Sequence, residues 1–107
     1  MYRYLFPALL ILQVPNAFAD DCMANARISE DAYRKMRGEM LRAAAYLKAG
    51  NRAGACEPAL QALNHSEHEL KTAKLLHRFC GIADITVSEK NHKNTKEMVK
   101  MICGFLP

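Results

Sequence analysis

The sequence predicts an all-α protein, a small antiparallel four-helix bundle cross-linked by two disulfides. Apolar residues recur at helical spacing in several segments, and no group of segments has the alternation that would support a β-rich fold. Four cysteines in a short chain that begins like an exported protein indicate two disulfides. The 107 residues suffice for one domain with a modest core, and domains of this size often need covalent cross-links.

Residues 1–19 are predicted to be a cleaved secretory signal peptide. Arg3 gives a short positive start, Leu5–Leu12 is an apolar run, and Ala17-Phe18-Ala19 fits an A-x-A cleavage site. The run is shorter than the roughly 20 residues that span a bilayer. The alternatives are a retained membrane anchor or a buried N-terminal helix. We therefore expect residues 20–107 to form a single helical domain, periplasmic or secreted, with no transmembrane anchor after cleavage.

The first half of this domain is predicted to hold two helices. Asp20–Ile28 lacks a clear period and reads as a lead-in segment that Cys22 ties down. The first helix is expected from Ser29, a plausible N-cap, to about Ala49, with Gly50 ending it.

The second helix is expected over Asn51–Asn64, where Pro58 is the difficult residue. An interior proline removes a hydrogen bond and clashes with the preceding turn. The helix should therefore either start near Cys56–Pro58 or be kinked there.

Ser66–Cys80 is the best-specified helix of the sequence. Ser66 and Glu69 have the spacing of a capping box, and Gly81 suits a C-cap. The charged residues form a thin strip, which is typical of a helix that is buried on two flanks. We expect this segment to be the central helix, with His65 in the connection before it.

The final part of the chain is predicted to be a connector, a polar segment and a last helix. Ile82–Val87 is an extra helical turn or a buried extended connector, and Ser88–Asn94 is a solvated loop or an exposed helix start. Asn94 and Glu97 repeat the cap signature, so the last helix is expected to begin at Thr95 and to end at Gly104.

The four cysteines allow three disulfide connectivities. In an up-and-down bundle of four helices, Cys56 and Cys80 would lie at one end, and Cys22 and Cys103 at the other. The predicted disulfides are therefore Cys56–Cys80 and Cys22–Cys103. A four-cysteine metal site is disfavoured, because it normally needs closely spaced cysteine pairs.

No enzyme signature is present. The serines Ser29, Ser66 and Ser88 each stand where a helix would begin, which makes them candidate caps rather than nucleophiles. The glycines lie singly, so there is no phosphate-binding loop. We expect no catalytic residues and no cofactor.

A metal site has only weak candidates, which are His65, His68 and Glu69 around the start of the Ser66–Cys80 helix. They fall short of a built site, because His65 with either of the others gives two ligands and zinc takes three or four protein ligands. The methionines could bind copper(I), but most follow the apolar stripes of the helices and fit gap-filling in a small core better.

The expected function is binding to another protein. The net charge of +4 is mild, and no basic run is interleaved with aromatic residues, so nucleic-acid binding is not expected. We predict a small exported non-enzymatic binding protein of the protein-inhibitor or immunity-protein type, with another envelope protein as partner. Its alternatives are an envelope stress or chaperone-like protein, or a periplasmic copper or zinc carrier that uses His65, His68 and methionines. The candidate partner-binding residues are Lys90, His92, Lys93 and Lys96.

Overall fold

The computed structural model describes residues 2–81 and 84–104, with side chains from residue 21 onward. Three α-helices make up this part of the chain: α1 (Tyr2–Lys48), α2 (Arg52–Leu75) and α3 (Ile85–Cys103). A π-helical turn, η1 (Leu76–Cys80), directly continues α2. The described residues contain no strand, so the all-α prediction is confirmed.

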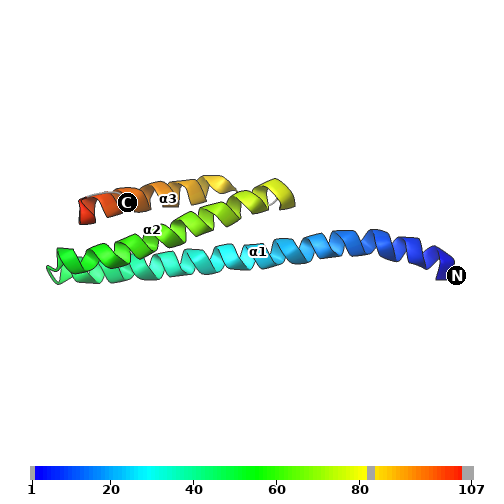
Figure 1. Ribbon diagram of the computed structural model, residues 1–107, viewed down its shortest axis with the longest axis horizontal. Helices are drawn as coiled ribbons and strands as arrows, with labels where there is room; N and C mark the ends of the chain where they lie inside the picture. Colours follow the sequence, from blue (N-terminus) through cyan, green and yellow to red (C-terminus); the bar gives the residue numbers. More distant parts are fainter. Residues whose placement is uncertain (1, 82–83, 105–107) are drawn as a thin grey trace.

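The helix α2 lies between α1 and α3 and packs against both of them (Figure 1). The chain reverses direction at the turn around Gly50, and α3 runs back along α2 (Figure 1). The N-terminal part of α1 extends past the other two helices, so the molecule is long and narrow (Figure 1). The central element is therefore α2, and its two flanks build the grooves described below.

The four-helix prediction is corrected to three helices, because Asn51–Asn64 and Ser66–Cys80 form one continuous rod of α2 and η1. Ser66 does not cap a helix. It is fully buried, and its Oγ donates to the Leu63 carbonyl oxygen at 2.8 Å within the same helix. A serine can satisfy its hydroxyl in this way inside a helix, so the capping-box pattern alone did not mark a helix start.

Two further helix starts differ from the sequence prediction. The helix α1 runs through Asp20–Ile28 and Ser29, so this stretch is neither a lead-in segment nor a helix start. In α3 the N-cap is Asp84, whose carboxylate accepts the Thr86 backbone N–H at 2.9 Å. Ser88–Asn94 is accordingly helical rather than a loop, while residues 82–83 of the predicted connector lie outside the described residues.

The predicted helix ends at Gly50, Gly81 and Gly104 are confirmed. All three glycines have positive φ values, 76° at Gly50, which residues with an L side chain rarely adopt. Pro58 lies buried inside α2, which begins earlier, after the N-cap Asn51. The Asn51 side chain accepts the Gly54 N–H at 2.8 Å, so this cap starts the helix ahead of the proline.

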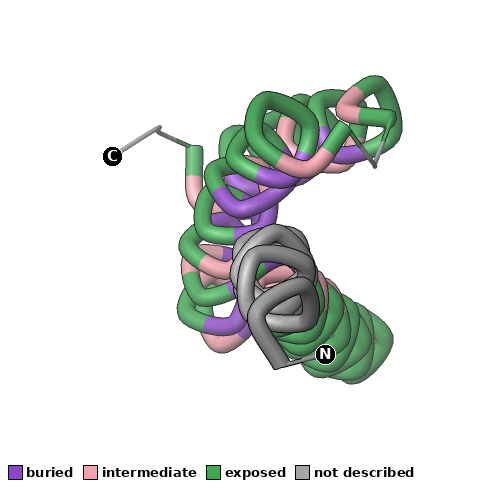
Figure 2. The backbone as a smooth tube through the Cα atoms, turned by 90° about the vertical axis from the view of Figure 1, so that its right-hand side faces the viewer, coloured by how far each residue is buried: buried purple, intermediate pink, exposed green. Residues whose placement is uncertain are grey.

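Small residues at the helix contacts allow α1 and α3 to approach α2 closely. Seen along the molecule, the buried positions face the neighbouring helices, while the outer sides are exposed (Figure 2). The main core cluster is rich in alanine and consists of Ala43, Ala55, Ala59, Leu63, Val99 and Ile102.

Both disulfides are present, but they pair differently from the prediction. The structure contains Cys22–Cys80, with a Cα–Cα distance of 5.9 Å, and Cys56–Cys103, with a distance of 5.1 Å. The predicted pairing of Cys56 with Cys80 assumed a chain reversal near His65. Because α2 and η1 are continuous, these two cysteines lie about 36 Å apart along the rod.

Candidate functional site

A basic groove between α2 and α3 is the feature that best fits a binding surface. It has a volume of about 290 Å³. We define the basic groove by its six lining residues, which are Glu67, Leu70, Lys71, Lys74, His92 and Lys96.

The charges in the basic groove are unbalanced. Lys71 and Lys74 lie one turn apart on α2, and Lys96 faces them from α3. Of the described lining residues, Glu67 alone carries a carboxylate. The three lysines are solvent-exposed, so their positive potential can act on an approaching anionic surface and should be screened by salt.

His92 links the two walls of the basic groove. Its Nε2 lies 3.7 Å from Glu67 Oε1, and the imidazole side chain is 19% exposed. That distance is too long for a hydrogen bond, and His92 Nε2 has no hydrogen-bond partner among the residues that the structure describes. His92 Nε2 is itself buried, so an approaching partner would meet the exposed lysines of the basic groove before it.

The structure separates the four predicted partner-binding residues into two pairs. His92 and Lys96 line the basic groove. Lys90 and Lys93 are exposed on α3 but do not line it. Lys71 and Lys74 were not among the predicted partner-binding residues, although both belong to the thin charged strip of the Ser66–Cys80 segment, which places them on one side of α2.

The predicted metal candidates do not converge. His65 and His68 line a second groove of about 310 Å³ between α1 and α2, together with Arg27, Asp31 and Lys35. Glu69 instead points to α3, where its Oε1 accepts the Ser88 hydroxyl at 2.7 Å. Among the residues described, no group of three or more His, Cys, Asp or Glu side chains is arranged to hold a metal ion.

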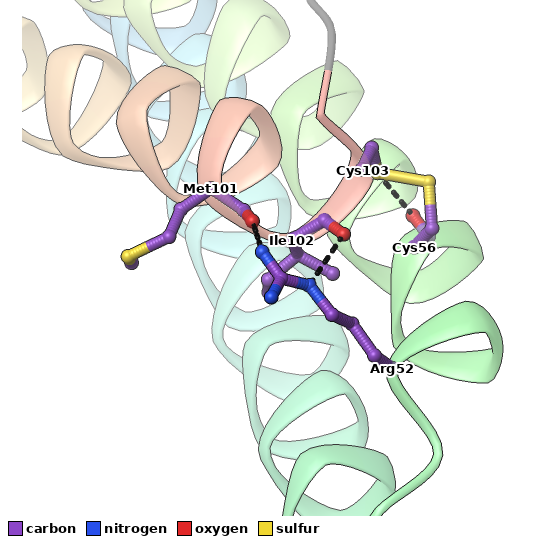
Figure 3. Close-up of a disulfide and its surroundings, with 5 residues drawn as sticks. All are labelled: Arg52, Cys56, Met101, Ile102 and Cys103. Carbon is purple, nitrogen blue, oxygen red and sulfur yellow. Dashed lines mark hydrogen bonds between the residues drawn. A yellow bond between two sulfur atoms is a disulfide. The ribbon is translucent and has the colours of Figure 1, made fainter.

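The C-terminal end of α3 is held against the start of α2 (Figure 3). Arg52 donates through Nε to the Ile102 carbonyl oxygen at 3.3 Å and through a second guanidinium nitrogen to that of Met101. The positive charge of Arg52 at the C-terminus of α3 also interacts favourably with the helix dipole. Beside it, Cys103 is bonded to Cys56, and its sulfur lies 3.6 Å from the Cys56 carbonyl oxygen. This end of the α2–α3 pair is therefore both covalently and electrostatically restrained.

Within the part of the chain that the structure describes, no helix is both long and apolar enough to span a membrane. Comparisons with protein-family models, curated proteins and solved structures find no match to this chain.

Proposed function

We propose that this protein is a small exported, non-enzymatic binding protein of the inhibitor or immunity type, which holds an acidic surface of another envelope protein in the basic groove. The observation that carries the proposal is the convergence of Lys71, Lys74 and Lys96 from two helices around one carboxylate. A partner that presents several carboxylates would complement this potential, and such complementarity favours specificity and fast association.

Two disulfides support the assignment to an exported protein, since disulfides persist in oxidising compartments. In this proposal, residues 1–19 are removed as a signal peptide, and residues 20–107 act as one domain in the periplasm or outside the cell. The disulfides also restrain both ends of the continuous rod of α2 and η1, which would keep the basic groove in shape before the partner arrives and reduce the entropy lost on binding.

The basic groove can be tested by site-specific photo-crosslinking in extracts of the protein's own envelope fraction. A photoreactive residue at Lys96 should capture a partner, whereas one at Lys90, on the same helix but outside the basic groove, should not. The captured protein is then identified, purified and titrated against the wild-type chain at low and high salt.

Charge reversal gives the quantitative test. Lys71→Glu together with Lys96→Glu should weaken binding of the purified partner by about tenfold or more, mainly by slowing association, while Lys90→Glu should change it little. Equal losses in both variants, or an affinity that is independent of salt, would contradict the proposal.

A further inference from the structure

A third groove lies where all three helices meet, on the other side of α2 from the basic groove. It has a volume of about 320 Å³ and is lined by Glu30 and Tyr33 of α1, Glu69 of α2, Leu76 of η1, and Val87 and Asn91 of α3, among others. We call it the three-helix groove. Its size is at the lower end of the range for small-molecule pockets.

Glu69 is the unusual group of the three-helix groove. The residue is only 5% exposed, and its Oε1 accepts the Ser88 hydroxyl, but its Oε2 has no hydrogen-bond partner in the part of the chain that the structure describes. Leaving a buried carboxylate oxygen unpaired is costly, because the oxygen has lost its water without gaining a donor. Glu69 therefore brings to the wall of the groove a buried acceptor that a donor, above all a cationic one, would satisfy.

The rest of the lining restricts the chemistry of that donor. Among the described residues, no lysine or arginine lines the three-helix groove, and Glu30 is already paired with Arg34 at 2.6 Å on the surface. Leu76 and Val87 offer apolar walls, and Tyr33 offers an aromatic ring. A fitting molecule thus combines one positive charge with an apolar body.

We infer that the three-helix groove binds a small primary amine, whose ammonium group pairs with Glu69 Oε2 and whose apolar body lies against Leu76 and Val87. Because Oε2 is shielded from solvent, this pairing requires side chains at the mouth of the groove to move aside. Val87 is 61% exposed and Tyr33 is half-buried, so neither is locked in a packed core. The amine site is separate from the basic groove and does not depend on the proposed protein partner.

The test is an NMR titration of the ¹⁵N-labelled chain with 2-phenylethylamine and, as the neutral analogue, 2-phenylethanol. The amine should shift the amide signals around Tyr33, Val87 and Asn91 in a saturable way, and the alcohol should not. Glu69→Gln keeps the side-chain shape and an acceptor for Ser88 but removes the charge, so it should weaken amine binding by about tenfold or more. Glu57→Gln, at an exposed position on the same helix outside both grooves, is the matched control and should bind like the wild type.

A second variant keeps the inference testable should Glu69→Gln fold poorly. Val87→Lys places an internal ammonium group at the mouth of the three-helix groove, at an exposed position that should tolerate it. It should compete with the added amine and abolish the shifts while Glu69 remains intact. The inference is overturned by an absence of saturable shifts up to about 10 mM amine, by equal shifts with the alcohol, or by unchanged binding in both the Glu69 and Val87 variants.

Discussion

At the scale of single residues, Gly54 shows how a side chain can be excluded by one local contact. A Cβ at this position would lie 2.5 Å from Asn51 Nδ2 and 2.9 Å from Tyr46 Cδ1. Asn51 provides the N-cap of α2, so the methyl group would push against the residue that starts the helix. Gly54 is therefore required by close packing at the start of α2.

We expect Gly54→Ala to lower the free energy of unfolding by about 1–3 kcal/mol, through overpacking and a disturbed cap. Gly38→Ala is the matched control, because Gly38 lies inside α1 with nothing within 4 Å of an added Cβ. It should raise the free energy of unfolding by about 1 kcal/mol, since alanine is the better helix former. Denaturant unfolding of both variants measures the two effects, and a loss of stability in both would contradict this account.

The structural roles of some residues were predicted correctly from the sequence, and those of others were not. The glycines at Gly50, Gly81 and Gly104 were predicted correctly as helix ends, because their role depends on backbone conformation alone. Ser66 and Glu69 were predicted as a helix cap, but they are buried polar residues in the interior of α2. Their role depends on α1 and α3 covering them, which no local pattern encodes. For the same reason, the unpaired oxygen of Glu69 was not foreseeable.

At the scale of helices, α3 depends on a charged cap. The Thr86 hydroxyl and backbone N–H both donate to the Asp84 carboxylate, and this holds the pKa of Asp84 below its ordinary value, with a smaller contribution from His77. A lowered pKa in the folded state means that ionised Asp84 stabilises the fold above its unfolded pKa. This stabilisation is lost as the pH falls through the folded-state value.

We therefore expect part of the acid sensitivity of the protein, below about pH 4, to come from Asp84. Asp84→Asn keeps a capping side chain without a titrating group, so its melting temperature should fall less than that of the wild type between about pH 5 and pH 2. Thermal unfolding followed by circular dichroism at several pH values checks this. Parallel curves for the two proteins would show that Asp84 does not contribute.

Strong apolar stripes predicted which segments are helical, but the residues at which several helices begin were predicted wrongly. Asn94 and Glu97 looked like a cap, while the real cap, Asp84, stands ten residues earlier and has no acidic residue in the first turn behind it. The basic groove shows the same limitation. Its α3 residues His92 and Lys96 were predicted as binding candidates, but Lys71 and Lys74 were missed, because only the packing of α3 on α2 brings the two sets together.

At the scale of the whole molecule, the disulfides carry much of the stability. Their sequence separations are 58 and 47 residues, and loops of that length restrict the unfolded chain by about 4 kcal/mol each in the chain-entropy model. Small domains have a total stability of roughly 5–15 kcal/mol. The fold should therefore survive the loss of one disulfide better than the loss of both.

We expect Cys56→Ser together with Cys103→Ser to lower the free energy of unfolding by about 4 kcal/mol, and the pair Cys22→Ser with Cys80→Ser to do so by a similar amount. All four substitutions together should leave the chain largely unfolded at 25 °C. Guanidinium unfolding of the three variants gives the comparison. A fully folded four-serine variant would show that helix packing alone suffices.

The cysteine count predicted two disulfides correctly, but the pairing was wrong because it depended on the number of helices. The chain was expected to turn at His65, but the helix continues through it. Every later segment therefore runs in the opposite direction to the one expected, and Cys80 lies at the other end of the molecule. The cysteine pairing depends on the path of the entire chain, so a single wrong turn changes both disulfides.

The crossed pairing also determines what happens when the backbone is cut. Cys22–Cys80 encloses Cys56, and Cys56–Cys103 encloses Cys80, so the two covalent loops overlap. A protease that cuts once between Cys22 and Cys56 and once between Cys80 and Cys103 leaves all three pieces joined. Had Cys56 been bonded to Cys80, the same two cuts would have released the middle piece. On a non-reducing gel the doubly cut protein should therefore remain one species, and it should separate into three only after reduction.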